Sequence, residues 1–177
     1  MTRIVAISGS RRTESTTRAA LRVALDAAAD AGAETDLLDL GTVDLPLYHP
    51  DEDAQGDSER LTRLVREADG VLAGTPVYHG SYSSTFKNFH DYCGFDEYEN
   101  TAVGLLATAG GGSYGGTLEH LRSTFRNVHA WTVPHEVGIR GASSAIDADG
   151  RIRDEDLLKR TRKLGRIVTE HAVRLND

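Results

Sequence analysis

A segment close to the N-terminus carries hydroxyl and guanidinium side chains at a spacing that suits phosphate binding. Residues 8–17 read Ser-Gly-Ser-Arg-Arg-Thr-Glu-Ser-Thr-Thr and follow a short apolar run. A helix that begins at the end of this segment would offer unpaired backbone N–H groups and the positive end of its dipole, which favour an anion. The side chains that we expect to add donors are those of Ser10, Arg12, Ser15, Thr16 and Thr17.

The glycine and lysine content of this segment indicates which phosphate would fit. A dinucleotide-binding loop needs further glycines to let the backbone approach a pyrophosphate, and after Gly9 the next glycine is Gly32. A Walker loop needs Gly-Lys-Ser/Thr, and the segment contains no lysine. The segment therefore favours a terminal monophosphate. An ordinary turn capped by serine and threonine, with surface arginines, would show the same residue types.

A second segment, residues 75–98, suggests a planar ligand, a protein interface, or both. Seven of the chain's 11 aromatic residues lie between Tyr78 and Tyr98, and aromatic rings serve both purposes. Pro76 fixes the backbone where an apolar run ends, and Gly80 permits a close backbone approach. The pair Phe86 and Phe89 shares one helical face, which is more often part of a core than of an interface.

A third segment is dominated by glycine. Five of the seven residues from Gly110 to Gly116 are glycines, so the backbone N–H groups are bare enough to meet the polar edge of a ring. A flexible connection between a strand and a helix would have the same composition.

The remaining candidates favour no metal or nucleophile site and no nucleic acid. The single cysteine, Cys93, reads as a small buried apolar residue, and His129 and His135 are spaced for neither a helix face nor adjacent ligands. Ser81 lacks the sequence context of a catalytic nucleophile. The net charge of −7 disfavours nucleic acid, and no apolar run approaches the ~18 residues of a membrane span. We expect a cytoplasmic protein.

Strand-like and helix-like segments alternate along the chain. Runs at 3–8, 34–40, 70–75, 101–108 and 130–139 predict strands; helices are expected near 15–31, 61–68, 83–92, 116–126 and from 154. This alternation predicts one α/β domain over residues 1–177, with a doubly wound parallel sheet and helices on both faces. Residues 141–150 are expected to form a loop or short hairpin. Ligands of such sheets bind beyond the carboxyl ends of the strands, where the three segments would lie.

Taken together, the three segments resemble the NADPH-dependent FMN reductase family of the flavodoxin-like superfamily. The matching motifs are Gly9-Ser10-x-Arg12-x-x-Ser15, then Pro76-Val77-Tyr78-His79-Gly80-Ser81 with Lys87-Asn88 and Asp91, and glycines 110–112. The resemblance covers about residues 3–130 in the right order. It implies a five-stranded sheet of order 2-1-3-4-5.

The resemblance also implies a role for each segment. The first would hold the FMN phosphate through Ser10, Arg12, Ser15, Thr16 and Thr17. The second would wrap the isoalloxazine with Pro76, Val77, Tyr78, His79, Gly80 and Ser81, and the third would meet its pyrimidine edge with Thr108, Gly110, Gly111, Gly112 and Ser113. Two positions depart from the family pattern: Thr17 stands where asparagine is frequent, and His79 where asparagine, arginine or lysine is common.

The function implied is hydride transfer from NADPH or NADH, through N5 of bound FMN, to free flavin, a quinone, an azo compound or a metal oxyanion. The flavin would carry the chemistry, so no catalytic side chain is expected. Family members are usually homodimers or tetramers. The alternatives are a flavodoxin-type electron carrier, the flavin reductase partner of a two-component monooxygenase, and a flavin-free interaction protein.

Overall fold

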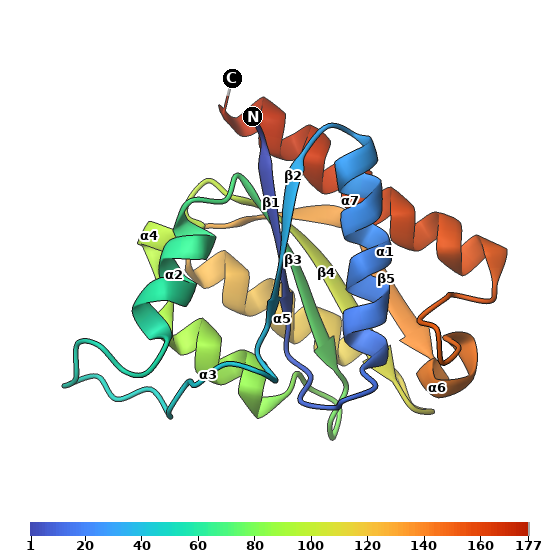
Figure 1. The fold of residues 1–177 in the computed structure, drawn as a ribbon, viewed down its shortest axis with the longest axis horizontal. Helices are drawn as coiled ribbons and strands as arrows, with labels where there is room; N and C mark the ends of the chain where they lie inside the picture. Colours follow the sequence, from blue (N-terminus) through green and yellow to red (C-terminus); the bar gives the residue numbers. More distant parts are fainter. Residues whose placement is uncertain (177) are drawn as a thin grey trace.

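The computed structural model describes residues 1–176, and its centre is a five-stranded parallel sheet of order β2-β1-β3-β4-β5 (Figure 1). The strands are β1 (Arg3–Ser8), β2 (Glu34–Asp39), β3 (Gly70–Pro76), β4 (Ala102–Ala109) and β5 (Trp131–Arg140). This order and the parallel pairing confirm the predicted flavodoxin-like fold. All strands therefore end at the same edge of the sheet.

Helices cover both faces of the sheet (Figure 1). One face packs against α1 (Thr16–Asp30) and α7 (Glu155–Asn176), and the other against α2 (Ser58–Arg66), α3 (Ser84–Tyr92) and α5 (Gly115–Asn127). Strands β3 and β4 are buried along their whole length because both of their faces are covered. Such strands read as continuous apolar runs, which is why they stood out in the sequence.

Helices α1 and α7 pack with their backbones close together. Gly165 of α7 has no room for a Cβ, because that atom would collide with the carbonyl of Ala24 in α1. The alanine-rich face of α1 makes this approach possible, since Ala20, Ala24 and Ala28 are fully buried. Helix α1, which begins beside the first segment, is thereby held in place along its length.

The predicted strands agree with the structure to within about two residues at each end. Two single-turn helices were not predicted: α4 (Phe95–Tyr98) and α6 (Ala142–Ala145). Four residues are too few to show helical periodicity. After α6, an isolated antiparallel bridge joins Ile146 to Ile152, so residues 141–152 combine a short helix and a small hairpin. Within residues 1–176, none of the helices combines the length and the apolar character that crossing a membrane requires.

Much of the aromatic concentration at 78–98 builds the core. Phe86, Phe89 and Tyr98 are at most 1% exposed, and they pack with Phe125 of α5. This confirms the core interpretation of Phe86 and Phe89. Tyr78 and Phe95 are about half exposed, so they remain free to meet a ligand or another protein.

Candidate functional site

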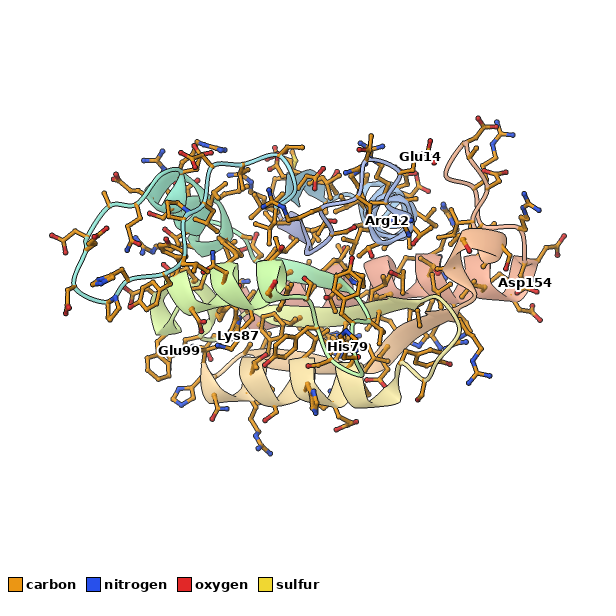
Figure 2. All side chains as sticks on the ribbon, turned by 90° about the horizontal axis from the view of Figure 1, so that it is seen from below. Arg12, Glu14, His79, Lys87, Glu99 and Asp154 are labelled. Carbon is orange, nitrogen blue, oxygen red and sulfur yellow. The ribbon has the colours of Figure 1, made fainter. Side chains whose placement is uncertain are left out.

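The loops after β1, β3 and β4 meet at the carboxyl edge of the sheet, which Figure 2 views from below. Gly9 N donates to Gly74 O at 2.8 Å, and Val77 N donates to Thr108 O at 2.8 Å. The hydroxyls of Thr17 and Thr108 lie 2.6 Å apart, which ties the start of α1 to the end of β4. The structure therefore brings all three predicted segments together. We call them the first loop (residues 9–15), the second loop (77–83) and the third loop (110–114).

The first loop leads directly into the N-terminus of α1. Ser15 caps this helix, because its Oγ accepts from Arg18 N at 3.1 Å while its backbone is extended. The first bond along the helix runs from Ala19 N to Ser15 O. The N–H groups of Thr16 and Thr17 have no partner among residues 1–176. They are the donors that a helix N-terminus offers to an anion.

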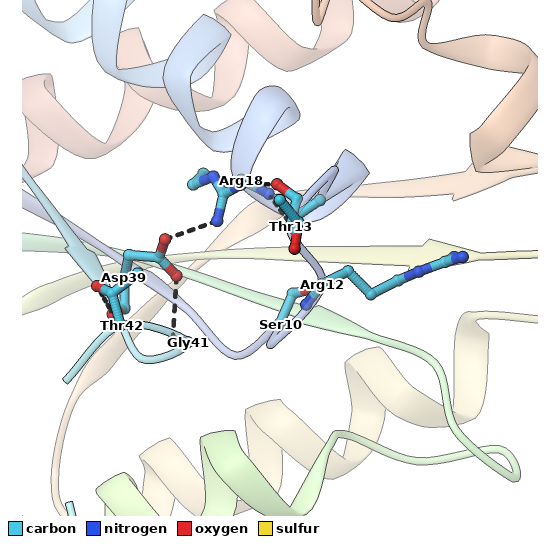
Figure 3. Close-up of polar contacts among 8 residues, drawn as sticks. Ser10, Arg12, Thr13, Arg18, Asp39, Gly41 and Thr42 are labelled. Carbon is cyan, nitrogen blue, oxygen red and sulfur yellow. Dashed lines mark hydrogen bonds and ion pairs between the residues drawn. The ribbon is translucent and has the colours of Figure 1, made fainter. Parts of the chain in front are cut away.

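The hydroxyl groups of the predicted phosphate-binding residues differ in whether their protons are free to donate a hydrogen bond. Ser10 Oγ accepts from Arg12 N at 3.3 Å and Ser15 Oγ accepts from Arg18 N, so each hydroxyl proton stays available. Thr17 is 1% exposed and its hydroxyl is engaged with Thr108. The structure thus places the Thr17 backbone N–H, rather than its hydroxyl, among the free donors. The Arg12 side chain is exposed and extends away from Arg18 (Figure 3).

The second loop contains a tight turn. Tyr78 N donates to Ser81 O at 3.0 Å and Ser81 N to Tyr78 O at 3.1 Å, while His79 and Gly80 have φ values of 51° and 80°. Two successive positive φ values make this a turn of type I′, which requires glycine or a residue that tolerates the left-handed region. A Cβ on Gly80 would meet nothing within 4 Å. Backbone conformation, and not crowding within the protein, therefore requires glycine here.

Ser83 connects the second loop to the first. Its Oγ donates to Gly9 O at 2.6 Å and accepts from Phe86 N at 3.1 Å, which caps α3. Its backbone N–H donates to Thr75 Oγ1 at 2.9 Å. A Cβ on Gly9 would lie only 2.7 Å from the Cβ of Phe86, so the two chains are in direct contact. Ser83 and Thr75 were not among the predicted site residues.

The third loop is an open stretch of backbone. Gly110, Gly111 and Gly112 are exposed, and a Cβ on any of them would meet nothing within 4 Å. The loop adjoins the second loop, since a Cβ on Gly116 would lie 3.5 Å from Gly80 O. Exposed backbone N–H groups beside the turn of the second loop could donate hydrogen bonds to the polar edge of a flat ring.

Residues 2–144 match the family described as NADPH-dependent FMN reductase. The chain belongs to this family. An NADPH azoreductase of Bacillus sp. (strain OY1-2) is 36% identical over 143 residues, which are 78% of this chain and 77% of that protein. An FMN-dependent NADPH-azoreductase of Staphylococcus aureus (strain USA300) is 29% identical over 152 residues, covering 81% and 80%.

Solved structures agree on the fold. The flavoenzyme NAD(P)H:(acceptor) oxidoreductase FerB from Paracoccus denitrificans superposes with a TM-score of 0.84 at 24% identity, covering 98% of both chains. Family membership confirms the predicted class of enzyme: an NAD(P)H-dependent oxidoreductase with FMN as its cofactor. The predicted cradle fits this cofactor, because the unpaired N–H groups at α1 suit its phosphate and the open glycine backbone suits its ring.

His120 is a further residue of the site in this FMN reductase that sequence reasoning missed. Its Nδ1 lies 2.9 Å from Ser81 Oγ, and its ring packs edge-on against Tyr82. The histidine belongs to α5 and the serine to the second loop, so the bond joins the second loop to the helix that follows the third loop. No local motif links residues 39 positions apart, and the only available signal was the position of His120 one turn into the helix after the glycines.

The strongly shifted titratable groups lie below the loops, in the core. Burial and, to a smaller extent, the nearby Lys87 lower the pKa of His90 to about 4. Burial also raises the pKa values of Cys93 and Tyr98. Cys93 is 9% exposed, as predicted for a small apolar residue. These groups are packed away from the carboxyl edge and fit a structural role.

Proposed function

We propose that this FMN reductase passes hydride from NADPH or NADH through FMN to a flat aromatic acceptor, with azo compounds as the first class. The observation that carries the proposal is the joining of three loops into one cradle, with free helix N–H groups at one end and bare glycine backbone at the other. The azo class is supported by the names of two relatives. The other proposed acceptors are quinones and free flavin, which are flat like azo compounds, and metal oxyanions, which like them accept electrons.

At the phosphate end, the chain would bind the monophosphate in three ways. The N–H groups of Thr16 and Thr17 would donate to it, the hydroxyls of Ser10 and Ser15 would add donors, and Arg12 would neutralise charge. A side chain that is exposed and free of acidic partners within residues 1–176 can turn toward an anion at little cost. Thr17 would also orient the third loop through Thr108.

At the ring end, the residues 76–81 and 108–113 would hold the isoalloxazine. Bound FMN would supply the site that accepts hydride and releases electrons to the acceptor. The turn at Tyr78–Ser81 would fix the plane of the ring, and Gly110, Gly111, Gly112 and Ser113 would meet its polar edge. The free N–H groups at the start of α3, beyond the Ser83 cap, would stabilise negative charge on reduction.

We further propose a cytoplasmic homodimer or tetramer. Exposed aromatic side chains support self-association: Tyr78 lies at the carboxyl edge, and Phe95 and Trp131 lie at the opposite end of the sheet, at 49%, 53% and 60% exposure. Dependence on NADPH or NADH supports the cytoplasmic location. Light scattering at micromolar concentration tests the assembly: a single 19.2 kDa species would contradict it.

Anaerobic stopped-flow reduction tests the function. FMN-loaded protein is mixed with NADPH and then with an azo dye, and the flavin and dye absorbances are followed. We expect fast flavin reduction, dye bleaching, and ping-pong steady-state kinetics. An electron carrier of the flavodoxin type would not be reduced by NADPH, and that result would refute the proposal.

The phosphate assignment has its own test in Arg12→Ala. Loss of a charge-assisted hydrogen bond should weaken FMN binding roughly 10- to 100-fold, while riboflavin, which lacks the phosphate, should bind as before. Equal losses for both ligands, measured by flavin fluorescence, would place the phosphate elsewhere.

A further inference from the structure

A cluster of arginines lies on the outer side of the first loop, next to the proposed FMN cradle, with which it shares Arg12. It surrounds a hollow of about 330 Å³ lined by Arg11, Arg12, Thr13, Arg18, Arg22, Asp39, Gly41 and Thr42. Four arginines and a single carboxylate line it, although the whole chain carries a net charge of −7. A concentration of positive charge in an acidic protein points to an anionic ligand.

The floor of this hollow is rigid. Arg18 Nη1 lies 2.6 Å from Asp39 Oδ2, with both side chains less than one-fifth exposed, and Arg18 also donates to Thr13 O (Figure 3). The same carboxylate accepts from Gly41 N at 3.1 Å. Because Ser8 and Asp39 are paired in the sheet, the first loop and the turn after β2 leave the same edge side by side.

The rim of the hollow carries charges that nothing in the described chain compensates. Arg11 and Arg22 are exposed and form no ion pair within residues 1–176, whereas the one acid of the lining is already paired with Arg18. Gly41 fits closely against the first loop, since a Cβ there would lie 2.8 Å from Ser10 O. The hollow is therefore preformed, and its free donors are guanidinium groups that suit a phosphate dianion.

We propose that this hollow binds the 2′-phosphate of NADPH, so that Arg11 and Arg22 select NADPH over NADH. This inference rests on the proposed function. The FMN phosphate is the weaker candidate for the hollow, because the free N–H groups of Thr16 and Thr17 serve it and neither residue lines the hollow. The second and third loops offer no alternative, since residues 76–81 and 108–113 contain no lysine or arginine.

The decisive variant is Arg11→Gln/Arg22→Gln, with Arg140→Gln as its matched control. Arg140 is also exposed, ends β5 at the same edge, and has no ion-pair partner within residues 1–176, but it does not line the hollow. The probes are adenosine 2′,5′-bisphosphate and adenosine 5′-monophosphate, titrated calorimetrically into FMN-loaded protein. We expect the parent protein to prefer the bisphosphate about tenfold or more, as a charge-assisted phosphate contact should allow.

In the double variant, bisphosphate binding should fall roughly 10- to 100-fold while monophosphate binding and FMN affinity stay the same. The ratio of kcat/KM for NADPH to that for NADH should fall by a similar factor, with the NADH value unchanged. Arg140→Gln should leave all of these quantities as they are.

Three results would overturn the inference: equal losses for both nucleotides, loss of FMN affinity in the double variant, or loss of the NADPH preference in Arg140→Gln. The third result would place the 2′-phosphate beside the third loop. Failure of the proposed function is distinct, because neither NADPH nor NADH would then reduce the flavin, while the two nucleotide titrations would still report on the hollow.

Discussion

The second and third loops lie side by side at the same edge, yet they are built in opposite ways. The second loop is fixed by paired hydrogen bonds across its turn, by Ser83 at its base and by a tightly packed α3 beneath it. The third loop has three successive glycines with open space around each. Contacts hold the second loop in its conformation, whereas the third loop is open backbone with few contacts. A substitution in the second loop should therefore change structure and activity more than one in the third loop.

The largest expected effect is that of acid on the region below the second loop. His90 of α3 has a pKa of about 4, lowered from 6.5 by burial, so the native state binds fewer protons than the unfolded state between these values. Stability should therefore be complete above about pH 6.5 and should fall by ~3 kcal/mol as the pH drops toward 4. Chemical unfolding measured against pH checks this.

A matched variant isolates the histidine. His90→Phe keeps an aromatic ring between Phe86 and Tyr98 and should flatten the pH dependence over that range. Hydrogen exchange at pH 4.5 should rise at residues 84–98 more than at 108–116. If the stability of the variant falls with pH as much as that of the parent protein, the acid sensitivity belongs to other groups.

Gly80→Val should damage the turn most. Valine is β-branched and strained at a φ of 80°, so the turn should open and displace the backbone N–H groups beside it. Misplacement by ~1 Å can cost about 100-fold in rate. Stopped-flow flavin reduction measures the loss.

The neighbouring change His79→Ala is the contrast. If His79 supplies only backbone, hydride transfer should persist within about tenfold and keep its pH profile. A His79→Ala protein that binds FMN normally but is not reduced would demonstrate an imidazole role.

Ser83→Ala should have an intermediate effect. It removes the cap of α3 and the donor to Gly9 O, and leaves the buried Phe86 N–H without its partner. Losses of this kind cost about 1–2 kcal/mol, so the thermal midpoint and the FMN affinity should both fall. Ser84→Ala, at an exposed neighbouring position, is the control and should change neither.

The smallest effect is expected in the third loop. Gly111→Ala adds a methyl group to open space at a residue without a positive φ, so the stability of the flavin-free protein should change by less than ~0.5 kcal/mol. FMN binding should nevertheless weaken if the ring edge meets this backbone. An unchanged FMN affinity would remove Gly111 from the cradle.

The sequence was most informative where local chemistry decides the structure. Alternating apolar runs located the five strands, and the Ser15 cap and the His79-Gly80 pair have local causes that short-range patterns carry. The strand order came from the family resemblance and was confirmed. The roles proposed for the individual site residues stay predictions.

Side-chain pairs distant in sequence could not be predicted. The Thr17–Thr108 bond, the Ser81–His120 bond and the Arg18–Asp39 pair each join different elements. Their partners are selected by how the elements pack, and no spacing along the chain encodes that. The aromatic segment illustrates the same limit, because composition alone does not separate Phe86 in the core from Tyr78 at the surface.

The burial of Cys93 has a consequence for the protein's chemical durability. Reduced flavins react with oxygen to give peroxide, which attacks thiolates in preference to thiols. Because burial raises the pKa of Cys93, the side chain stays a thiol and is screened from such by-products. Because Cys93 is the only thiol of the chain and is buried, a thiol-specific dye can label it only when the packing around α3 and α4 opens. The labelling rate therefore reports how often this region opens.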